Sequence, residues 1–128
     1  MIKVQYVGGT KFKAETRGLK TTMDLPADKG GTNSAMTPTE LMVSSLGGCI
    51  ALYVTEYLKQ IGVDPAGTMV EMRFEMADAP RRVGRLRAKV EVPAGIPENR
   101  RAAVQRVAEH CPVHHTLHGV PETVIEIA

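Results

Sequence analysis

The stretch from residue 37 to residue 61, TPTELMVSSLGGCIALYVTEYLKQI, decides the fold of this protein. Thr37 can serve as an N-cap, Pro38 fits the first helical position, and Glu40 completes a capping box. The pattern therefore predicts a helix that begins at Pro38 and runs to the end of this stretch. Residues 41–55 contain no charged side chain. A helix that is apolar around its whole circumference must be buried on all sides, which is difficult in a small domain unless a second subunit covers part of it.

The length and composition indicate one soluble globular domain over residues 1–128. Hydrophobic residues make up 43% of the chain and charged residues 23%, which is ordinary for such a domain. The formal charge of +2 gives no indication of electrostatic binding to nucleic acid. No segment is expected to span a membrane, which requires about 18 or more apolar residues. Two cysteines do not make a secreted disulfide framework, so we expect a reducing cytoplasm.

The residues before the helix alternate in the way that is typical of short strands. Apolar and polar side chains alternate at the N-terminus and again around Phe12, with Gly8-Gly9 suited to a tight turn between the two runs. A third strand is expected over residues 20–25. Residues 26–36, PADKGGTNSAM, are rich in turn formers and predict a loop.

The residues after the helix predict a hairpin, a second helix and a last strand. The hairpin strands alternate over residues 70–76 and 86–92, and the second helix is expected from Pro97 to His110. Thr123, Ile125 and Ile127 alternate as a closing strand. The predicted order βββ-α-ββ-α-β belongs to the α+β class, with two helices packed on antiparallel sheets.

Cys49 stands in the middle of the long helix, directly after two glycines. Each glycine inside a helix costs about 1 kcal/mol relative to alanine, so a close neighbour or ligand should compensate. A free cysteine in such a place is also a common small buried hydrophobe. Both interpretations of Cys49, as a reactive thiol and as a core residue, stay open at this point.

Cys111 stands in HCPVHHTLH, residues 110–118, which holds all four histidines. Pro112 favours the start of a new helical turn, so Cys111 is predicted to cap a short helix over residues 112–118 that ends at Gly119. The positive end of that helix should lower the pKa of the Cys111 thiol. A metal site is disfavoured, because no histidine elsewhere completes a tetrahedral ligand set.

Two motifs together resemble the OsmC/Ohr family of osmotically induced and organic hydroperoxide resistance proteins. They are GGTNSAMTPTELMVSSLGGC over residues 30–49 and HCPVHHTL over residues 110–117, followed by the predicted closing strand. The resemblance covers nearly the whole chain. It implies an intertwined homodimer, in which two long central helices are wrapped by antiparallel sheets from both chains.

The resemblance also implies a thiol peroxidase that acts on organic hydroperoxides. Cys49 would then be the peroxidatic thiol and Cys111 the resolving thiol. The peroxide would oxidise Cys49 to a sulfenic acid, Cys111 would form a disulfide with it, and a dithiol, of lipoyl type in the best-known branch, would reduce that disulfide. No metal, flavin or haem is required by this chemistry.

One departure from the family pattern concerns the groups that activate the reactive thiol. Peroxidase members use a Glu that usually lies ten residues before the cysteine, where this chain has Thr39. Glu40 is the nearest candidate, although at about 100° per residue it lies roughly half a turn around the helix from Cys49. Arg17, the only arginine before the helix, is the candidate for the second activating group. Glu40 has a competing role in the capping box, and Arg17 could equally be a solvated residue at a strand end.

Two alternatives to the peroxidase remain. A non-enzymatic dimeric stress protein could bind a small apolar or thiol-containing ligand in the same cleft, which the replacement of Glu by Thr39 favours. A metal-binding protein centred on the histidines would contain stoichiometric zinc, and we expect none.

Overall fold

The computed structural model describes residues 1–128 and consists of two compact units, Met1–Met42 and Val43–Ala128. The long helix α1, Pro38–Gln60, begins in the first unit and continues into the second. Its start at Pro38 agrees with the sequence pattern, and its end lies within one residue of the expected position.

The first unit is a three-stranded antiparallel sheet with the order β1-β2-β3. Its strands are β1, Lys3–Gly8, β2, Lys11–Thr16, and β3, Leu19–Met23. Gly8 and Gly9 both adopt positive φ angles, 116° and 55°, in the tight turn between the first two strands. The predicted loop that follows contains one short helix, η1, Ala27–Lys29.

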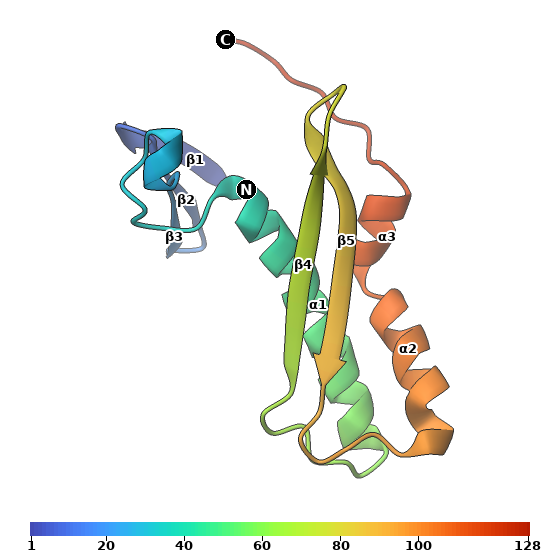
Figure 1. Ribbon diagram of the computed structural model, residues 1–128. Coiled ribbons are helices and arrows are strands. Elements are labelled where there is room, and N and C mark those ends of the chain that lie inside the picture. Colours follow the sequence, from blue (N-terminus) through green and yellow to red (C-terminus); the bar gives the residue numbers. More distant parts are fainter. The chain divides into compact units, whose positions relative to one another are not determined.

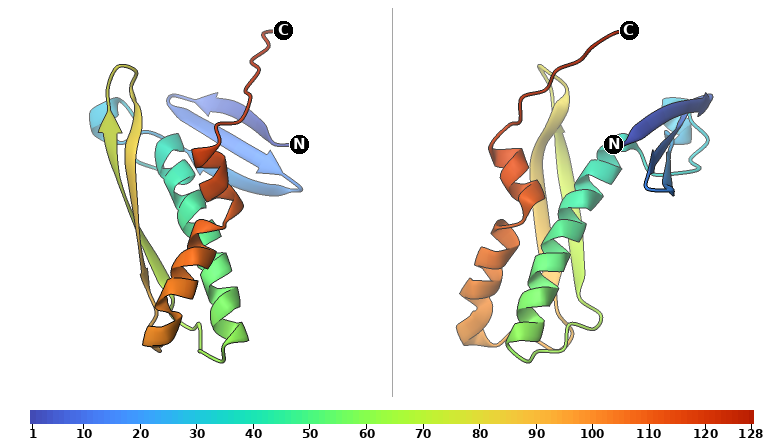
Figure 2. Two further views of the ribbon diagram at one scale, coloured as in Figure 1. Left: turned by 90° about the vertical axis from the view of Figure 1, so that its right-hand side faces the viewer. Right: turned by 180° about the vertical axis from the view of Figure 1, so that it is seen from behind.

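The second unit places three helices on one face of an antiparallel hairpin (Figures 1 and 2). The hairpin consists of β4, Met69–Ala77, and β5, Arg82–Glu91. The turn η2, Glu98–Arg100, leads into α2, Arg101–Glu109, and α3 is Pro112–His118. The second predicted helix therefore begins with one tight turn, and the α+β class is confirmed.

The core of the second unit is a small apolar cluster between α1, α2 and α3. Its buried members are Leu46, Ile50, Val54, Leu58, Val104 and Cys111. The inward residues of the hairpin, among them Val70, Met72, Leu86 and Val90, pack against this cluster. The core thus surrounds one of the two cysteines.

The helix α1 is buried on one face only within a single chain. Val43, Leu46, Ile50, Val54 and Leu58 are buried, whereas Leu52 on the opposite face is 57% exposed. Within one chain the hairpin and α2 cover only part of the circumference of α1, and burial of the remaining face by a second subunit stays a prediction.

The length and apolar composition of α1 also meet the criterion for a membrane-crossing helix, with a mean hydropathy of 1.4. This differs from the expectation that no segment comes near that criterion. Core helices of soluble proteins meet it too, and one face of α1 is packed against protein.

The predicted closing strand is absent in the single chain. Residues 119–128 carry no strand and extend away from α3 (Figure 1), and Ile125 and Ile127 are 82% and 91% exposed. The prediction of a strand through Thr123 is therefore wrong for the isolated chain. A strand needs a neighbour for its backbone hydrogen bonds, and here none pairs with this segment.

Candidate functional site

The two cysteines meet in the core of the second unit. Cys49 on α1 is half-buried and packs against the apolar cluster that contains Cys111, which is fully buried. Their side chains are close enough to interact, because the Cys49 side chain is one of the groups that raise the pKa of Cys111. Both are reduced. The structure thus brings together two thiols that lie 62 positions apart in the sequence, at numbers 49 and 111.

Cys111 is the N-cap of α3, as the sequence predicts. Its backbone is extended, with φ −69° and ψ 143°, and its Sγ accepts a hydrogen bond from the backbone N–H of His114 at 3.3 Å. Pro112 follows at the start of the helix, where its missing N–H costs nothing. The cap fixes the position of the Cys111 sulfur at the contact with Cys49.

The predicted lowering of the Cys111 pKa is wrong. Burial raises the pKa of the Cys111 thiol, because the thiolate loses hydration in the apolar core. The N–H of His114 opposes this shift by stabilising the thiolate, while the neighbouring Cys49 side chain raises the pKa further. Desolvation therefore outweighs the capping interaction at this sulfur.

The histidines beside Cys111 are held by backbone carbonyl groups. The Nδ1 atoms of His110, His114 and His118 lie 2.6, 2.8 and 3.0 Å from the carbonyl oxygens of Arg106, Glu109 and His114. The rings of His114 and His118 are neighbours, with centroids 4.2 Å apart. No three His, Cys, Asp or Glu side chains gather in a way that could hold a metal ion.

Glu40 takes part in the predicted capping box at the start of α1. Its Oε2 accepts a hydrogen bond from the backbone N–H of Thr37 at 2.8 Å, and its own N–H donates to Thr37 Oγ1 at 3.1 Å. These two bonds confirm the structural role of Glu40. A catalytic role for it stays a prediction.

Arg17 lies in the turn between β2 and β3 of the first unit. Its side chain is exposed, and its φ of 50° is unusual for a residue other than glycine. Its role toward Cys49, which lies in the second unit, stays a prediction.

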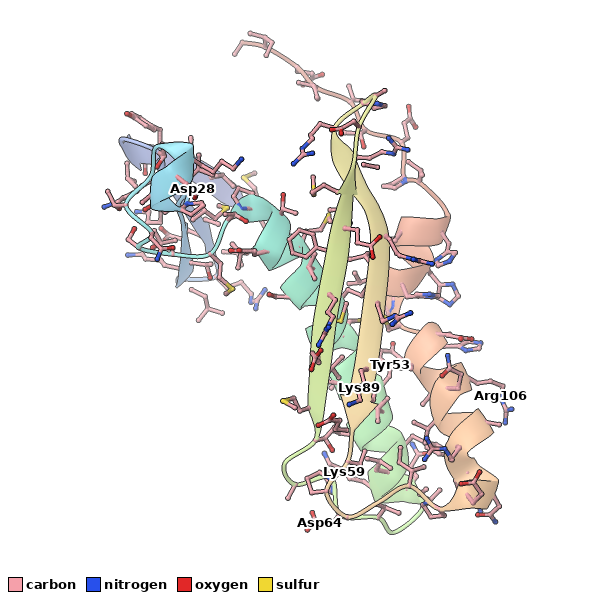
Figure 3. The ribbon with its side chains drawn as sticks, in the orientation of Figure 1. Asp28, Tyr53, Lys59, Asp64, Lys89 and Arg106 are labelled. Atoms are coloured by element: carbon pink, nitrogen blue, oxygen red, sulfur yellow. The ribbon has the colours of Figure 1, made fainter.

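Tyr53 is a neighbour of Cys49 that the sequence analysis missed. It follows Cys49 by four residues, so both project from the same side of α1. Figure 3 shows it on α1, and it lines a groove of about 370 Å³ between α1 and α2 with Leu52, Tyr57 and Val107. The spacing of four residues was the signal that could have identified it.

Asp24 is a second residue that was missed, and it organises the loop of the first unit. It is buried, and its carboxylate accepts hydrogen bonds from the side chains of Thr10, Thr32 and Ser34 and from the backbone N–H groups of Leu25, Thr32 and Ser34. The hydroxyl groups of Thr10 and Thr32 hold the pKa of Asp24 well below its usual range. An acidic residue followed by a GGTNS segment was the available signal.

A comparison with family models gives one match, to the family described as OsmC-like protein, over residues 31–126. No curated protein matches the chain. Both cysteines and the whole second unit up to residue 126 lie inside the matched region.

Several solved structures share the fold. A protein from Psychrobacter arcticus 273-4, provisionally assigned to osmotic stress and detoxification responses, is 26% identical, with a TM-score of 0.83 over 90% of this chain and 85% of that one. An organic hydroperoxide resistance protein OsmC from Legionella pneumophila is 19% identical, with a TM-score of 0.64 over 93% and 90%. An organic hydroperoxide resistance protein from Elizabethkingia anophelis is 16% identical, with a TM-score of 0.70 over 94% and 89%. The last two similarities concern the fold alone.

Proposed function

Because the chain belongs to the OsmC-like family, we propose that it is a thiol-dependent peroxidase that reduces organic hydroperoxides. The observation that carries the proposal is the contact between the half-buried Cys49 and the buried Cys111. Two thiols in contact can form a disulfide without a large rearrangement of the chain. The organic hydroperoxide resistance proteins that share the fold support the choice of substrate.

In the proposed reaction the Cys49 thiolate attacks the distal oxygen of the hydroperoxide. The O–O bond breaks, the alkoxide leaves as an alcohol after it takes up a proton, and Cys49 becomes a sulfenic acid. Cys49 is the first thiol in this scheme because its side chain is the more exposed of the two.

Cys111 then resolves the sulfenic acid. Its thiolate attacks the Cys49 sulfur, the S–O bond breaks, water leaves, and a disulfide forms. An external dithiol, which can be of lipoyl type, restores both cysteines by two exchange steps and is itself oxidised to a disulfide. The raised pKa of Cys111 favours its protonated form while Cys49 attacks the peroxide.

The proposed assembly is a cytoplasmic homodimer with an antioxidant role in the stress response. The exposed apolar face of α1 and the unpaired C-terminal segment are the features that support a second copy. Arg17 and Glu40 remain the candidate activating groups for Cys49. Arg17→Ala should then lower kcat/KM about tenfold or more, whereas Lys20→Ala, a matched change on β3, should not.

The test is turnover of cumene hydroperoxide with a dithiol reductant, followed by mass spectrometry after one equivalent of peroxide. Cys111→Ser should accumulate sulfenic acid on Cys49, and Cys49→Ser should consume no peroxide. Turnover no faster than free cysteine, with both thiols intact, would refute the proposal.

A second candidate is a dimeric binding protein without peroxidase activity. It is favoured by Thr39 at the position of the usual Glu and by the two capping bonds that already engage Glu40. Measuring the alkylation rate of Cys49 against pH distinguishes the two, because a peroxidatic thiol reacts as a thiolate at neutral pH and an ordinary thiol does not.

A further inference from the structure

The second unit contains a pocket of about 480 Å³ that neither cysteine lines. It lies between β5, α1 and the α2–α3 segment, which adjoin one another in all views of the ribbon (Figures 1 and 2). This volume falls within the range of about 300–1,000 Å³ that is usual for small-molecule sites.

About half of the pocket wall is apolar. Leu46 and Ile50 come from α1, Leu86 and Val90 from β5, and Leu117 from α3. The first four also belong to the core or pack against it, so this wall is held in place by the fold. It offers a rigid surface to a hydrocarbon or aromatic body of a ligand.

The polar part of the pocket is built from His114, His118, Glu109 and Gln105. The Nδ1 atoms of both histidines bond to carbonyl oxygens, of Glu109 at 2.8 Å and of His114 at 3.0 Å. A carbonyl can only accept a hydrogen bond, so in the neutral rings Nδ1 carries the proton. The nitrogen that remains for a ligand is Nε2, which is an acceptor.

The charge at this end of the pocket selects against an anion. The Glu109 carboxylate belongs to the lining, and its Oε1 accepts a hydrogen bond from Gln105 Nε2 at 2.5 Å. A carboxylate ligand would meet a like charge, whereas a hydroxyl group could donate to a histidine Nε2.

The pocket is coupled to the thiols through His114. The ring of His114 lines the pocket, while its backbone N–H donates to Cys111 Sγ at 3.3 Å. Any contact that orders the seven-residue helix α3 will therefore also act on the cap at Cys111.

From these observations we propose that the pocket binds a neutral, hydroxyl-bearing organic molecule and that its occupancy controls the reactivity of Cys111. The apolar body of the ligand lies on Leu46, Ile50 and Leu86, and its hydroxyl donates to His114 or His118. This inference concerns a site other than the thiol pair and does not depend on peroxidase activity.

Binding is tested on the full chain by calorimetry and amide chemical shifts at pH 8, with 2-phenyl-2-propanol as the probe. The matched carboxylate, 2-methyl-2-phenylpropanoate, should bind about fivefold more weakly or worse. Saturable binding of the alcohol with shifts at residues 114–118 supports the site. Equal binding of the carboxylate, or no saturable binding of the alcohol, overturns it.

Two pairs of variants locate the ligand. Ala88→Leu fills the pocket and should abolish binding, whereas Ala102→Leu on the exposed side of α2 should not. His118→Phe removes one acceptor and should weaken binding about fivefold, whereas His115→Phe on the same helix, outside the lining, should leave it unchanged. Equal effects within either pair contradict the assignment.

The coupling to Cys111 is measured in the Cys49→Ser variant, in which Cys111 is the only thiol. Saturating alcohol should slow the alkylation of Cys111 by iodoacetamide about fivefold, because an ordered α3 opens less often. The addition of Ala88→Leu should remove this effect. An alkylation rate that does not respond to the bound alcohol overturns the control of Cys111.

Discussion

At the scale of the residue, two opposing effects act on the pKa of the Cys111 thiol. The N–H of His114 stabilises the thiolate, while the apolar core destabilises it, and burial prevails. A raised pKa leaves a smaller fraction of thiolate at any pH below it, so Cys111 becomes reactive only as the pH rises.

We predict that iodoacetamide at pH 8 labels Cys49 about tenfold or more faster than Cys111 in the native protein. Cys49 is half-buried and Cys111 is fully buried, and only the latter must open the core to react. Peptide mass spectrometry after timed quenching measures both rates. In concentrated urea the difference should vanish, and native rates that are equal would contradict this account.

The first unit stabilises the ionised form of the Asp24 carboxylate. Six hydrogen bonds hold it, and those from Thr10, Thr32 and Ser34 lower its pKa. A group with a lowered folded-state pKa contributes stability that is fully present above the unfolded pKa, about 4 for Asp, and is lost as the pH falls below it.

We therefore predict that Asp24→Asn lowers the Tm at pH 7 and that its deficit relative to the unmodified protein shrinks toward pH 2. Thermal unfolding followed by circular dichroism at both pH values measures this. Asp28→Asn, on the exposed η1 turn, is the matched control and should show neither effect. A deficit that does not depend on pH would argue against a role for the charge.

At the scale of the element, α1 is adapted to the hairpin at Gly47. A Cβ atom there would lie 2.8 Å from Met72 Cγ, too close for an unshifted side chain. Gly47 is buried, and its absent side chain lets Met72 of β4 pack on the helix. The sequence predicted that something must approach the helix closely at its glycines. For Gly47 that close neighbour is strand β4 of the same chain.

We predict that Gly47→Ala lowers the free energy of unfolding by about 1 kcal/mol. Alanine gains about 1 kcal/mol in helix propensity, and overpacking against Met72 costs about 1–3 kcal/mol. Denaturant unfolding in a double-mutant cycle checks the cause, because Gly47→Ala should become neutral or stabilising in a Met72→Ala background. A loss that persists there would assign the cost to another contact.

At the scale of the whole molecule, a single chain leaves too much apolar surface uncovered. Leu52 is exposed on α1, and the C-terminal segment exposes Val120, Val124, Ile125 and Ile127. Exposed apolar surface of this kind is typical of an interface between subunits. The proposed second copy would cover α1 and offer strand partners to the C-terminus.

We predict a mass of twice 13.9 kDa in solution, measured by analytical ultracentrifugation. Leu52→Glu should raise the dimer dissociation constant about 100-fold, because the interface would then bury an unpaired charge. Arg106→Glu, an exposed change on α2 (Figure 3), is the control and should leave the dimer intact. A monomer at micromolar concentration would contradict the proposed assembly.

The sequence determined those helix starts and turns that depend on interactions between residues a few positions apart. The capping box of Thr37 and Glu40, the glycine turn at Gly8-Gly9 and the cap at Cys111 all involve residues a few positions apart, and all three are present. The α+β class follows from the order of these elements and is confirmed, and so is the resemblance of two sequence motifs to the OsmC-like family.

Only the tertiary structure decided the environment of each side chain. The contact of Cys49 with Cys111 and the direction of the Cys111 pKa shift depend on segments far apart in the sequence. The six bonds to Asp24 depend on the path of a loop that no periodic pattern describes. Periodicity records which face of an element is apolar, but not what covers that face. For this reason the alternating pattern of residues 123–127 predicts a strand, although these residues have no neighbouring strand to pair with in the single chain.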